Sequence, residues 1–474
     1  MPGPCRPFLD GHAAGEPAPR SLRRRGRGQP RMNAFTGAFW RSGDPGFADA
    51  ATARVFNRRL PSRRPAAVLR AADVADVAEG VRLAAAEGWR VAVRSGGHSW
   101  AAWSLREDTL LIDLALFTGM SYDPTDATVT VGPAVRGGLD LDPYLAGHGR
   151  FFPVGHSPSV GMGGFLLQGG IGWNCRGWGW AAESLVSMEV VTAAGEVVRC
   201  SETENADLFW AARGSGPGFF GVVTAFRLRT RPRFRELTRS AYVFPSELAA
   251  EVLSWYHVAR HDLPASVELA AVGCTPPGSD APVLTVDAVS FDGGPASLAA
   301  LDSCPVVARA SARTVAEPVD FAELQAEQLR GNPENHRYAA DNAFLSGSAS
   351  ELVPALVPAF TELPTPRTFT VLGDFTPLVA RRPPDMAVSL QTDLYFAAYA
   401  IGTTPADDVL SRAWLDRTMS RLEPHSAGCY LGDSDLAVRA DRIMSDAAWS
   451  TFRRIRAARD PEGRFPGYLG DPAQ

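Results

Sequence analysis

Strand-like and helix-like spacings of apolar residues alternate through the first part of the chain. Residues 66–69, 90–94 and 109–114 are short apolar runs that predict strands. Between the first two runs, Asp73 precedes apolar residues at helical spacing, and Gly88 follows them. Because aspartate is a favoured N-cap and glycine a favoured residue after a helix, the spacing predicts a helix and hence an α/β unit.

The next stretch contains isolated strands and tight turns. The alternation at 128–131 predicts a half-buried strand, and 185–199 predicts a hairpin that turns at Ala194-Gly195. Two helices and a further strand are predicted over residues 136–147, 205–212 and 221–228, respectively.

The pattern changes at Arg231-Pro232-Arg233, which we take as a domain boundary. The predicted strands beyond it cover residues 239–244, 266–273, 283–291 and 388–400. The predicted helices cover 246–261, 295–302, 406–422 and 446–459, with proline-rich joints at 353–366 and 376–384. Strands mixed with helices in this way predict a second domain of the α+β class.

Composition limits the classes of function. The chain has 474 residues, enough for two or three domains, with ordinary hydrophobic and charged fractions of 45% and 21%. A net charge of −5 gives no sign of nucleic-acid binding. All 47 basic residues are arginines, which excludes chemistry that needs lysine, such as a pyridoxal-phosphate Schiff base or a P-loop NTPase.

Cysteine spacing and the N-terminal segment bear on the compartment. The six cysteines are scattered, which argues against a disulfide framework and a zinc site, and we expect no metal. No apolar run approaches the roughly 18 residues of a membrane-spanning helix. Residues 1–32 are expected to be a disordered leader without the apolar region of an export signal, and Met32 is an alternative start. We expect a cytoplasmic monomer or homodimer that binds neither membrane nor nucleic acid.

A glycine pair and a histidine follow the predicted strand at 90–94. Glycines in this Ser-Gly-Gly-His-Ser sequence, residues 95–99, can take φ > 0 and point successive N–H groups into one concavity. Such a nest binds an anion, typically a phosphate, and imidazole is also a nucleophile. Taken alone, the motif fits a cofactor site and a chance histidine in a tight turn equally well.

Residues 155–172 form a second motif, with seven glycines. Their spacing does not match the G-x-G-x-x-G of a Rossmann fold. A flexible surface loop is one explanation. The glycines alternate with apolar residues, however, which favours buried backbone that passes close to a large flat ligand.

The two motifs, at this separation, resemble those of the berberine-bridge-enzyme-like flavoproteins, which have the vanillyl-alcohol-oxidase or PCMH type of FAD-binding fold. Further resemblances lie at residues 180–185, 205–214, 218–224 and 460–465. The resemblance implies an α+β fold in which an N-terminal half and the returning C-terminal tail form the FAD-binding domain. An inserted substrate domain, with an antiparallel sheet covered by helices, lies over the flavin. We expect these parts at residues 33–232, 426–474 and 233–425, respectively.

The resemblance also assigns roles near the first motif. His98 matches the family histidine that is bonded covalently to the flavin 8-methyl group; the alternative is a histidine that is only hydrogen-bonded in the nest. The residues that match the pyrophosphate loop are Arg94, Ser95, Gly96, Gly97 and Ser99. Arg94 fits a solvated charge at a strand end as well.

Ser157 stands where many relatives form a second flavin bond through a cysteine. Because serine cannot form that thioether, the resemblance implies one covalent bond, through His98, and Cys175 is expected to be a packing residue. Val160 matches the position that controls oxygen access, and a valine there resembles the oxidases. The other residues expected along the cofactor are Gly161, Gly163, Gly164, Gly170, Gly172, Val222 and Val223, of which the two valines fit a buried strand equally.

The substrate side is less defined. Trp173, Trp178 and Trp180 form either a stacking wall for an aromatic or sugar substrate or a core cluster. Many relatives carry a Tyr-x-Asn that faces the flavin, and it is absent here. Tyr430 and Tyr395 are the candidate catalytic bases, with Tyr399 as a further phenol. A phenol needs a lowered pKa for that role, and each also fits a core or surface tyrosine.

These assignments imply an FAD-dependent oxidase. It would take a hydride from a secondary-metabolite alcohol, an amine or a sugar, and O₂ would reoxidise the flavin to give H₂O₂. One alternative is a dehydrogenase that uses an acceptor other than oxygen. Another is a non-redox cyclase or binding protein in which FAD is a scaffold.

Overall fold

The computed structural model describes residues 35–381, 384–470 and 472. The leader predicted over residues 1–32 lies outside the described residues. Among these, no helix is both long enough and apolar enough to cross a membrane.

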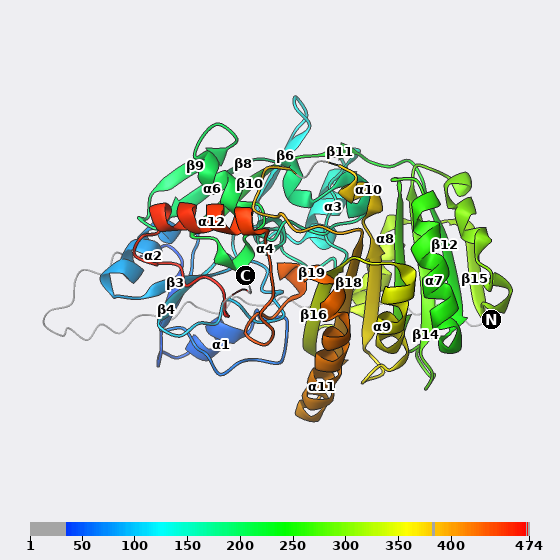
Figure 1. Cartoon of the computed structure of the whole chain (residues 1–474). Helices are drawn as coiled ribbons and strands as arrows, with labels where there is room; N and C mark the ends of the chain where they lie inside the picture. Colours follow the sequence, from blue (N-terminus) through cyan, green and yellow to red (C-terminus); the bar gives the residue numbers. More distant parts are fainter. Residues whose placement is uncertain (1–34, 382–383, 471, 473–474) are drawn as a thin grey trace, which may run out of the picture. The chain divides into compact units, whose positions relative to one another are not determined.

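A four-stranded sheet carries the predicted α/β unit (Figure 1). Its strands lie in the order β1 (Ala38–Arg41), β2 (Ala67–Arg70), β4 (Thr109–Asp113) and β3 (Arg90–Arg94). β4 pairs in parallel with both β2 and β3, so the carboxyl ends of these strands lie at one edge. Helix α2 (Val74–Ala86) contacts β3 and β4, and the Asp73 side chain caps it by accepting the Asp76 N–H. The strands and the helix predicted here are confirmed.

A five-stranded antiparallel sheet follows in the chain. Its order is β5 (Met120–Asp123), β6 (Thr128–Val131), β10 (Gly221–Arg229), β8 (Leu185–Thr192) and β9 (Val197–Ser201). The predicted hairpin is β8–β9, and its turn residue Gly195 has φ 75°. The helix predicted over 136–147 is a π-helical turn at Gly137–Leu141 continued by α3 (Asp142–Ala146), and that predicted over 205–212 is α6 (Ala206–Ala212). The short strands β7 (Arg150–Phe151) and β11 (Arg231–Pro232) pair beside this sheet's end.

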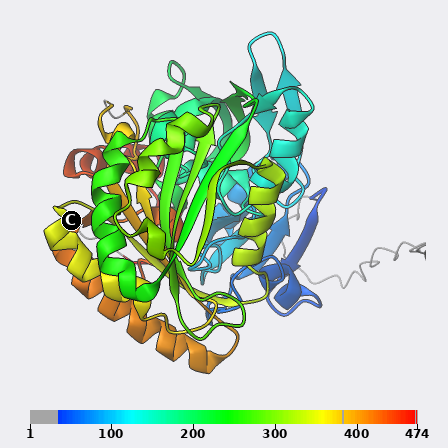
Figure 2. The ribbon, with the colours of Figure 1, turned by 90° about the vertical axis from the view of Figure 1, so that its right-hand side faces the viewer.

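The third sheet contains eight antiparallel strands within residues 237–428. Its order is β15 (Ala312–Pro318), β12 (Leu237–Pro245), β14 (Val283–Phe291), β13 (Val267–Cys274), β17 (Phe369–Asp374), β18 (Leu394–Gly402), β16 (Arg337–Leu345) and β19 (Ser426–Gly428). Figure 2 views the molecule from the end of this sheet where the green strand β12 lies, with the orange helix α11 along one side.

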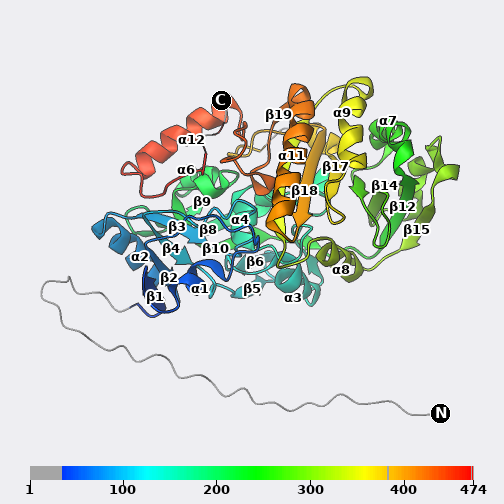
Figure 3. The ribbon, with the colours of Figure 1, turned by 90° about the horizontal axis from the view of Figure 1, so that it is seen from below.

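One face of this sheet is covered by helices α7 (Ala249–Ala259), α9 (Ala349–Thr361) and α11 (Pro405–Leu422). Figure 3 shows α7 and α9 on one side of the sheet and α8 (Phe321–Gly331) on the other side, beside α3. Successive strand residues point to opposite faces, so each strand contributes to both. On β13, Leu269 and Ala271 pack into the core under the helices, whereas Glu268, Ala270 and Val272 line the cavity on the opposite face.

The stretch predicted as a proline-rich joint, 353–366, is instead mostly helix α9. Ser348 and Glu351 form a capping box that fixes the start of the helix, and the apolar residues recur at helical spacing. Pro354 is exposed, so its ring does not enter the core. The prediction did not include β15, α8, β16 and β17. The helix predicted over 295–302 is a 3₁₀-helix at residues 295–303, and the strand predicted from residue 388 begins at Leu394.

The C-terminal segment returns to the first part of the chain. Helix α12 (Asp446–Arg459), red in Figure 1, packs against α6, and Arg459 pairs with Asp207 at 2.8 Å. Beyond α12, the carbonyl of Arg464 accepts a 2.8 Å hydrogen bond from the Val91 N–H. The remaining α-helices are short: α1 (Phe47–Thr52), α4 (Met162–Leu167), α5 (Cys175–Trp178) and α10 (Thr376–Val379).

Candidate functional site

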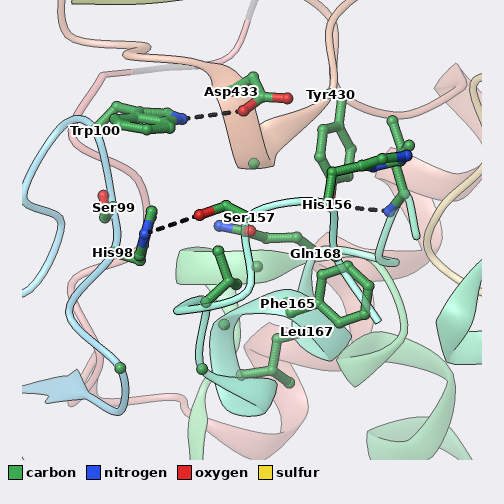
Figure 4. Close-up of a pocket in the computed structure, with 18 of the residues that line it drawn as sticks. His98, Ser99, Trp100, His156, Ser157, Phe165, Leu167, Gln168, Tyr430 and Asp433 are labelled. Carbon is green, nitrogen blue, oxygen red and sulfur yellow. Dashed lines mark hydrogen bonds between the residues drawn. The ribbon is translucent and has the colours of Figure 1, made fainter. Parts of the chain in front are cut away.

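A cavity of about 440 Å³ lies between the first part of the chain and the face of the eight-stranded sheet opposite α7, α9 and α11, and α8 also borders it. The loop after β3 and the glycine-rich segment 155–176 line one side of it, and residues 465–467 of the C-terminal segment line its end. Strands β13, β14, β17 and β18 line the other side. Both glycine motifs therefore open onto one space, as Figure 4 shows in part.

The loop after β3 requires its glycines. Gly97 has φ 79°, and a Cβ atom there would lie 1.9 Å from the carbonyl oxygen of Arg54. A Cβ on Gly96 would lie 2.8 Å from the backbone nitrogen of Gly161. The two motifs thus touch backbone to backbone, which only glycine allows.

A buried charge network holds this loop. Arg94 is completely buried and pairs with Asp113 at 2.9 Å, while its guanidinium also donates to the Ala50 carbonyl at 2.7 Å. Arg54 pairs with the same aspartate and donates to the Ser95 carbonyl at 2.7 Å. The alternative of a solvated strand-end charge at Arg94 is therefore wrong. Arg94 fixes the base of the loop, and no local sequence pattern marks Arg54 or Asp113 as its partners.

His98 lies in the cavity as a neutral imidazole. Its ring stacks on Phe56 with centroids 3.9 Å apart, and burial lowers the pKa of His98 to about 4. Its Nε2 atom is 3.1 Å from the Ser159 hydroxyl and 3.5 Å from the Ser157 hydroxyl (Figure 4). The structure therefore brings His98 and Ser157 together, and adds Ser159, which the sequence analysis missed.

The glycine-rich segment is buried and partly helical, so the surface-loop alternative is wrong. Helix α4 starts within it and buries Met162, Phe165 and Leu166. The predicted residues that line the cavity are Arg94, Ser95, Gly96, Gly97, His98, Ser99, Ser157, Val160, Gly161, Gly163, Gly164, Gly172 and Val223.

Two predicted cofactor residues do not line the cavity. Gly170 has φ 78°, and a Cβ there would lie 2.8 Å from the Ala181 Cβ, so it permits close packing. Val222 is completely buried within β10, with its side chain in the core. For Val222 the alternative of a buried strand residue is the one that the structure supports.

The three tryptophans separate in the structure. Trp173 lines the cavity, where its ring lies 4.5 Å from that of His156. Trp178 packs on Phe291, and Trp180 is buried against Tyr430. A stacking wall made by all three is therefore wrong, and only Trp173 faces the cavity.

Both candidate tyrosine bases line the cavity, but neither has the lowered pKa that the role requires. Burial raises the pKa of Tyr430, and its hydroxyl lies 3.4 Å from the Ile171 N–H. Burial and the neighbouring Asp433 raise the pKa of Tyr395 far above its usual value. Both phenols therefore stay protonated, which is the reverse of what we expected for a catalytic base.

Asp433 is the carboxylate that these side chains surround. It accepts a hydrogen bond from the Trp100 indole N–H at 3.0 Å (Figure 4). It also accepts one from the Tyr395 hydroxyl at 2.6 Å. It also borders the cavity. No local sequence pattern marks Asp433, because its partners Tyr395 and Trp100 are distant along the chain.

No group of three histidine, cysteine or acidic side chains in the described ranges is arranged to hold a metal ion. The five described cysteines are free, and burial raises the pKa of the Cys175 thiol. Cys175 borders the cavity as an unreactive neutral thiol.

Comparisons with known proteins agree on one family. An FAD-binding domain model matches residues 65–201. The FAD-linked oxidoreductase ptmO of Penicillium ochrochloron is 34% identical over 92% of this chain and 96% of its own length. Among solved structures, 6-hydroxy-D-nicotine oxidase of Arthrobacter nicotinovorans superposes with a TM-score of 0.80 at 21% identity, covering 94% of this chain and all of its own. A berberine bridge enzyme variant described as a reticuline dehydrogenase superposes with a TM-score of 0.77 at 18% identity, covering 91% of this chain and 95% of its own.

Proposed function

This chain belongs to the FAD-linked oxidoreductases of the berberine-bridge-enzyme type, and from that premise we propose that it is an oxidase that dehydrogenates a small-molecule substrate in the cavity. The observation that carries the proposal is one cavity that joins a phosphate-binding type of loop, a neutral histidine and a hydrogen-bonded carboxylate. A secondary-metabolite alcohol, an amine or a sugar is the substrate class. When bound, FAD supplies the two-electron acceptor, whose reoxidation by O₂ would give H₂O₂.

The residues present fit FAD. The backbone contact of Gly96 with Gly161 leaves no room for side chains, and a Cβ on Gly163 would lie 2.7 Å from the Ser95 hydroxyl. A nest of backbone N–H groups with no side chains in front of it suits a pyrophosphate. Val223 and the segment 465–467 border the other end of the same cavity.

We further propose that His98 bonds covalently to the flavin, as its only covalent attachment. A neutral, half-buried imidazole is nucleophilic, and the Phe56 ring stacks on it. Ser157 lies beside it but cannot form the second bond. Acid precipitation should leave the yellow colour with the protein, and Ser157→Cys should add a thioether detectable by mass spectrometry of flavin-bearing peptides. Release of all the colour from the wild type would contradict the linkage.

Asp433 is the proposed acceptor of the substrate proton. The Trp100 indole N–H donates to one oxygen of Asp433 and the Tyr395 hydroxyl to the other, and Tyr399 also hydrogen-bonds to it, so the carboxylate is fixed at the cavity wall. The substrate's acidic O–H or N–H would lie toward Asp433 and the C–H bond toward the flavin. The apolar side of the cavity excludes water around that bond.

Anaerobic mixing tests the function. Candidate alcohols, amines, sugars and phenols are added to the yellow protein without oxygen, and bleaching of the flavin absorbance identifies a substrate. Air should then restore the colour with one H₂O₂ per turnover. Binding without bleaching, across a set that includes a confirmed ligand, would support the scaffold alternative.

Val160 bears on oxygen use, since it lines the cavity at the position where the family resemblance implies access for O₂. Stopped-flow reoxidation of photoreduced protein separates the oxidase from the dehydrogenase. Reoxidation in air within seconds supports the oxidase. Reduced protein that persists for minutes in air would favour a dehydrogenase that uses an acceptor other than oxygen.

We also propose a cytoplasmic monomer or homodimer. The five described cysteines are unpaired, as in proteins of reducing compartments. Light scattering coupled to size exclusion would measure the mass, for which one or two times 50.7 kDa is expected.

A further inference from the structure

An ion pair that has no part in the function proposed above lies in the cavity wall. The Nε2 atom of His156 is 2.5 Å from one carboxylate oxygen of Glu268. The other oxygen of Glu268 accepts the backbone N–H of Asn174, also at 2.5 Å. Both oxygens of Glu268 are therefore engaged, and the carboxylate is fixed in place.

The chain topology turns His156 toward this carboxylate. Gly155 pairs with Gly172 in an isolated antiparallel bridge that joins the two ends of the segment, and the rings of His156 and Trp173 lie with centroids 4.5 Å apart. Figure 4 shows Ser157 directed toward His98 and the side chain of His156 leaving in another direction. His156 and Ser157 thus serve different parts of the cavity.

The 2.5 Å contact with Glu268 favours the charged form of His156. The charged groups that act on its imidazole are Glu268 on β13 and Asp433 in the segment after β19. Burial opposes protonation, but the attraction and hydrogen bond of Glu268 outweigh it and raise the pKa of His156. The imidazolium has two N–H groups. Nε2–H is donated to Glu268, and Nδ1 has no partner within residues 35–470 that are described.

The wall around this pair is mostly apolar. The sheet face presents small and aliphatic side chains to the cavity, namely Ala270, Val272, Val289, Val371 and Ala397. The His156 side chain keeps 33% of its surface accessible and borders this space. An available N–H donor in an apolar wall is a specific recognition point, because a ligand lacking an acceptor would leave it unsatisfied.

We propose that His156, kept as an imidazolium by Glu268, anchors the substrate by donating its Nδ1–H to an acceptor oxygen on an otherwise apolar molecule. The acceptor is a carbonyl, phenolate or carboxylate oxygen distant from the bond that is oxidised. This inference rests on the proposed function, because it takes the cavity to be the substrate site. His156 is a specificity-determining residue in this account and takes no proton from the substrate.

Two substitutions separate anchoring from a merely structural tie. The amide nitrogen of His156→Gln reaches the position of Nε2, so it keeps the hydrogen bond to Glu268 but loses Nδ1–H and the charge. Glu268→Gln keeps an acceptor for Asn174 and leaves a neutral imidazole that still has one N–H. His148→Gln is the matched control, because His148 packs against Tyr122 and Tyr144 away from the cavity.

The probes are benzoate, acetophenone and toluene, which carry an anionic oxygen, a neutral oxygen and no oxygen. Each is titrated into the yellow protein, and the shift of the flavin absorbance gives its dissociation constant. Benzoate and acetophenone should bind the wild type and His148→Gln at least about tenfold more tightly than toluene. In His156→Gln, benzoate and acetophenone should bind no more tightly than toluene. In Glu268→Gln, only the affinity of benzoate relative to toluene should fall. Unchanged ratios in His156→Gln would overturn the proposal.

Histidine ¹⁵N spectra provide a readout that does not depend on the flavin. The His156 ring should show two protonated nitrogens at pH 7, benzoate should shift the Nδ1 signal, and Glu268→Gln should make the ring neutral. If the protein is isolated without flavin, the proposed function is contradicted, but the histidine spectra can still be recorded and still test the anchor. A neutral His156 ring at pH 7 in the wild type would overturn the anchor alone.

Discussion

At the scale of single residues, the hydrogen bonds around Asp433 assign the proton chemistry. A carboxylate that accepts from both a phenol and an indole is held in one orientation, and the phenol that donates to it is kept protonated. Of the two candidate bases that the sequence indicated, Tyr395 therefore positions the proton acceptor as a hydrogen-bond donor, whereas the Tyr430 hydroxyl lies against the Ile171 N–H.

Asp433→Asn should slow anaerobic flavin reduction by a factor of about 10² to 10⁴, the usual contribution of a general base. The amide oxygen can still accept from Tyr395, but the NH₂ group then faces the Trp100 indole N–H, so the rate is expressed per bound flavin. Tyr430→Phe is the control and should slow reduction less than tenfold, because its hydroxyl contacts the Ile171 N–H, 3.4 Å away. Rapid-mixing absorbance measures both rates, and wild-type reduction by Asp433→Asn would refute the assignment.

Gly97→Ala should greatly reduce flavin content. The new Cβ would collide with the Arg54 carbonyl at 1.9 Å, in addition to the cost of φ 79° for a side chain. Gly43→Ala separates these two effects, since Gly43 has φ 95° but nothing within 4 Å of its Cβ position. The ratio of flavin to protein absorbance should fall in the first variant and stay at the wild-type value in the second. Equal ratios would mean that the loop tolerates a side chain.

The site was partly predictable from single residues. His98 and the glycines carry a visible sequence motif, because a turn that needs φ > 0 or a close backbone approach restricts residue type. Asp113, Arg54 and Asp433 do not, since a buried ion pair or a hydrogen-bonded carboxylate depends on partners far along the chain. Arg94 shows the limit: the resemblance assigned it to the pyrophosphate loop, with a solvated strand-end charge as the alternative, whereas its register partner Asp113 in β4 holds it as a buried charge.

At the scale of elements, the contact between β13 and the glycine-rich segment depends on charge. The raised pKa of His156 means that its charged form stabilises the folded state. This stabilisation is complete below the ordinary histidine pKa of about 6.5 and is lost as pH rises through the raised value in the fold. Wild type should exceed His156→Gln in unfolding free energy by about 1 kcal/mol near pH 6, and by less at pH 10.

Urea unfolding followed by tryptophan fluorescence measures this difference at each pH, and urea leaves the ion pair unscreened. His148→Gln should show no comparable trend. A difference between wild type and His156→Gln that stays constant from pH 6 to pH 10 would show that the pair is uncharged in the folded protein.

Elements were predicted well where periodicity and end signals coincide, as in α2, α11 and α12. They were missed where one signal overrode the other. In α9, two prolines outweighed the helical spacing of the apolar residues in the prediction. Burial of these residues stabilises the helix despite the backbone hydrogen bonds that the prolines remove; they are Leu352, Val353, Leu356, Ala359 and Phe360. In β16, Asp341 and Asn342 are buried and interrupt the apolar pattern, because Arg439 and Tyr430 satisfy them.

At the scale of the whole molecule, the cofactor end of the cavity is closed by chain segments that are far apart in sequence. Arg106 donates to the carbonyls of Gly467 and Tyr468, the latter at 3.1 Å, and Tyr468 in turn donates to the Ser215 carbonyl at 2.9 Å. Burial lowers the pKa of Arg106 to about 10, which leaves it charged at neutral pH. No local pattern predicts this closure, since both acceptors are backbone carbonyls.

Arg106→Ala should therefore weaken cofactor retention although Arg106 lies outside both glycine motifs. Its loss leaves buried carbonyls unpaired, at about 1–3 kcal/mol each, and frees residues 465–467 from the cavity wall. The flavin-to-protein ratio should fall and thermal unfolding should begin several degrees lower. Arg82→Ala, which removes an arginine that donates to the Gly195 carbonyl on a different surface, should change neither quantity. If both variants retain full flavin and the wild-type melting temperature, the C-terminal segment does not close the cofactor site.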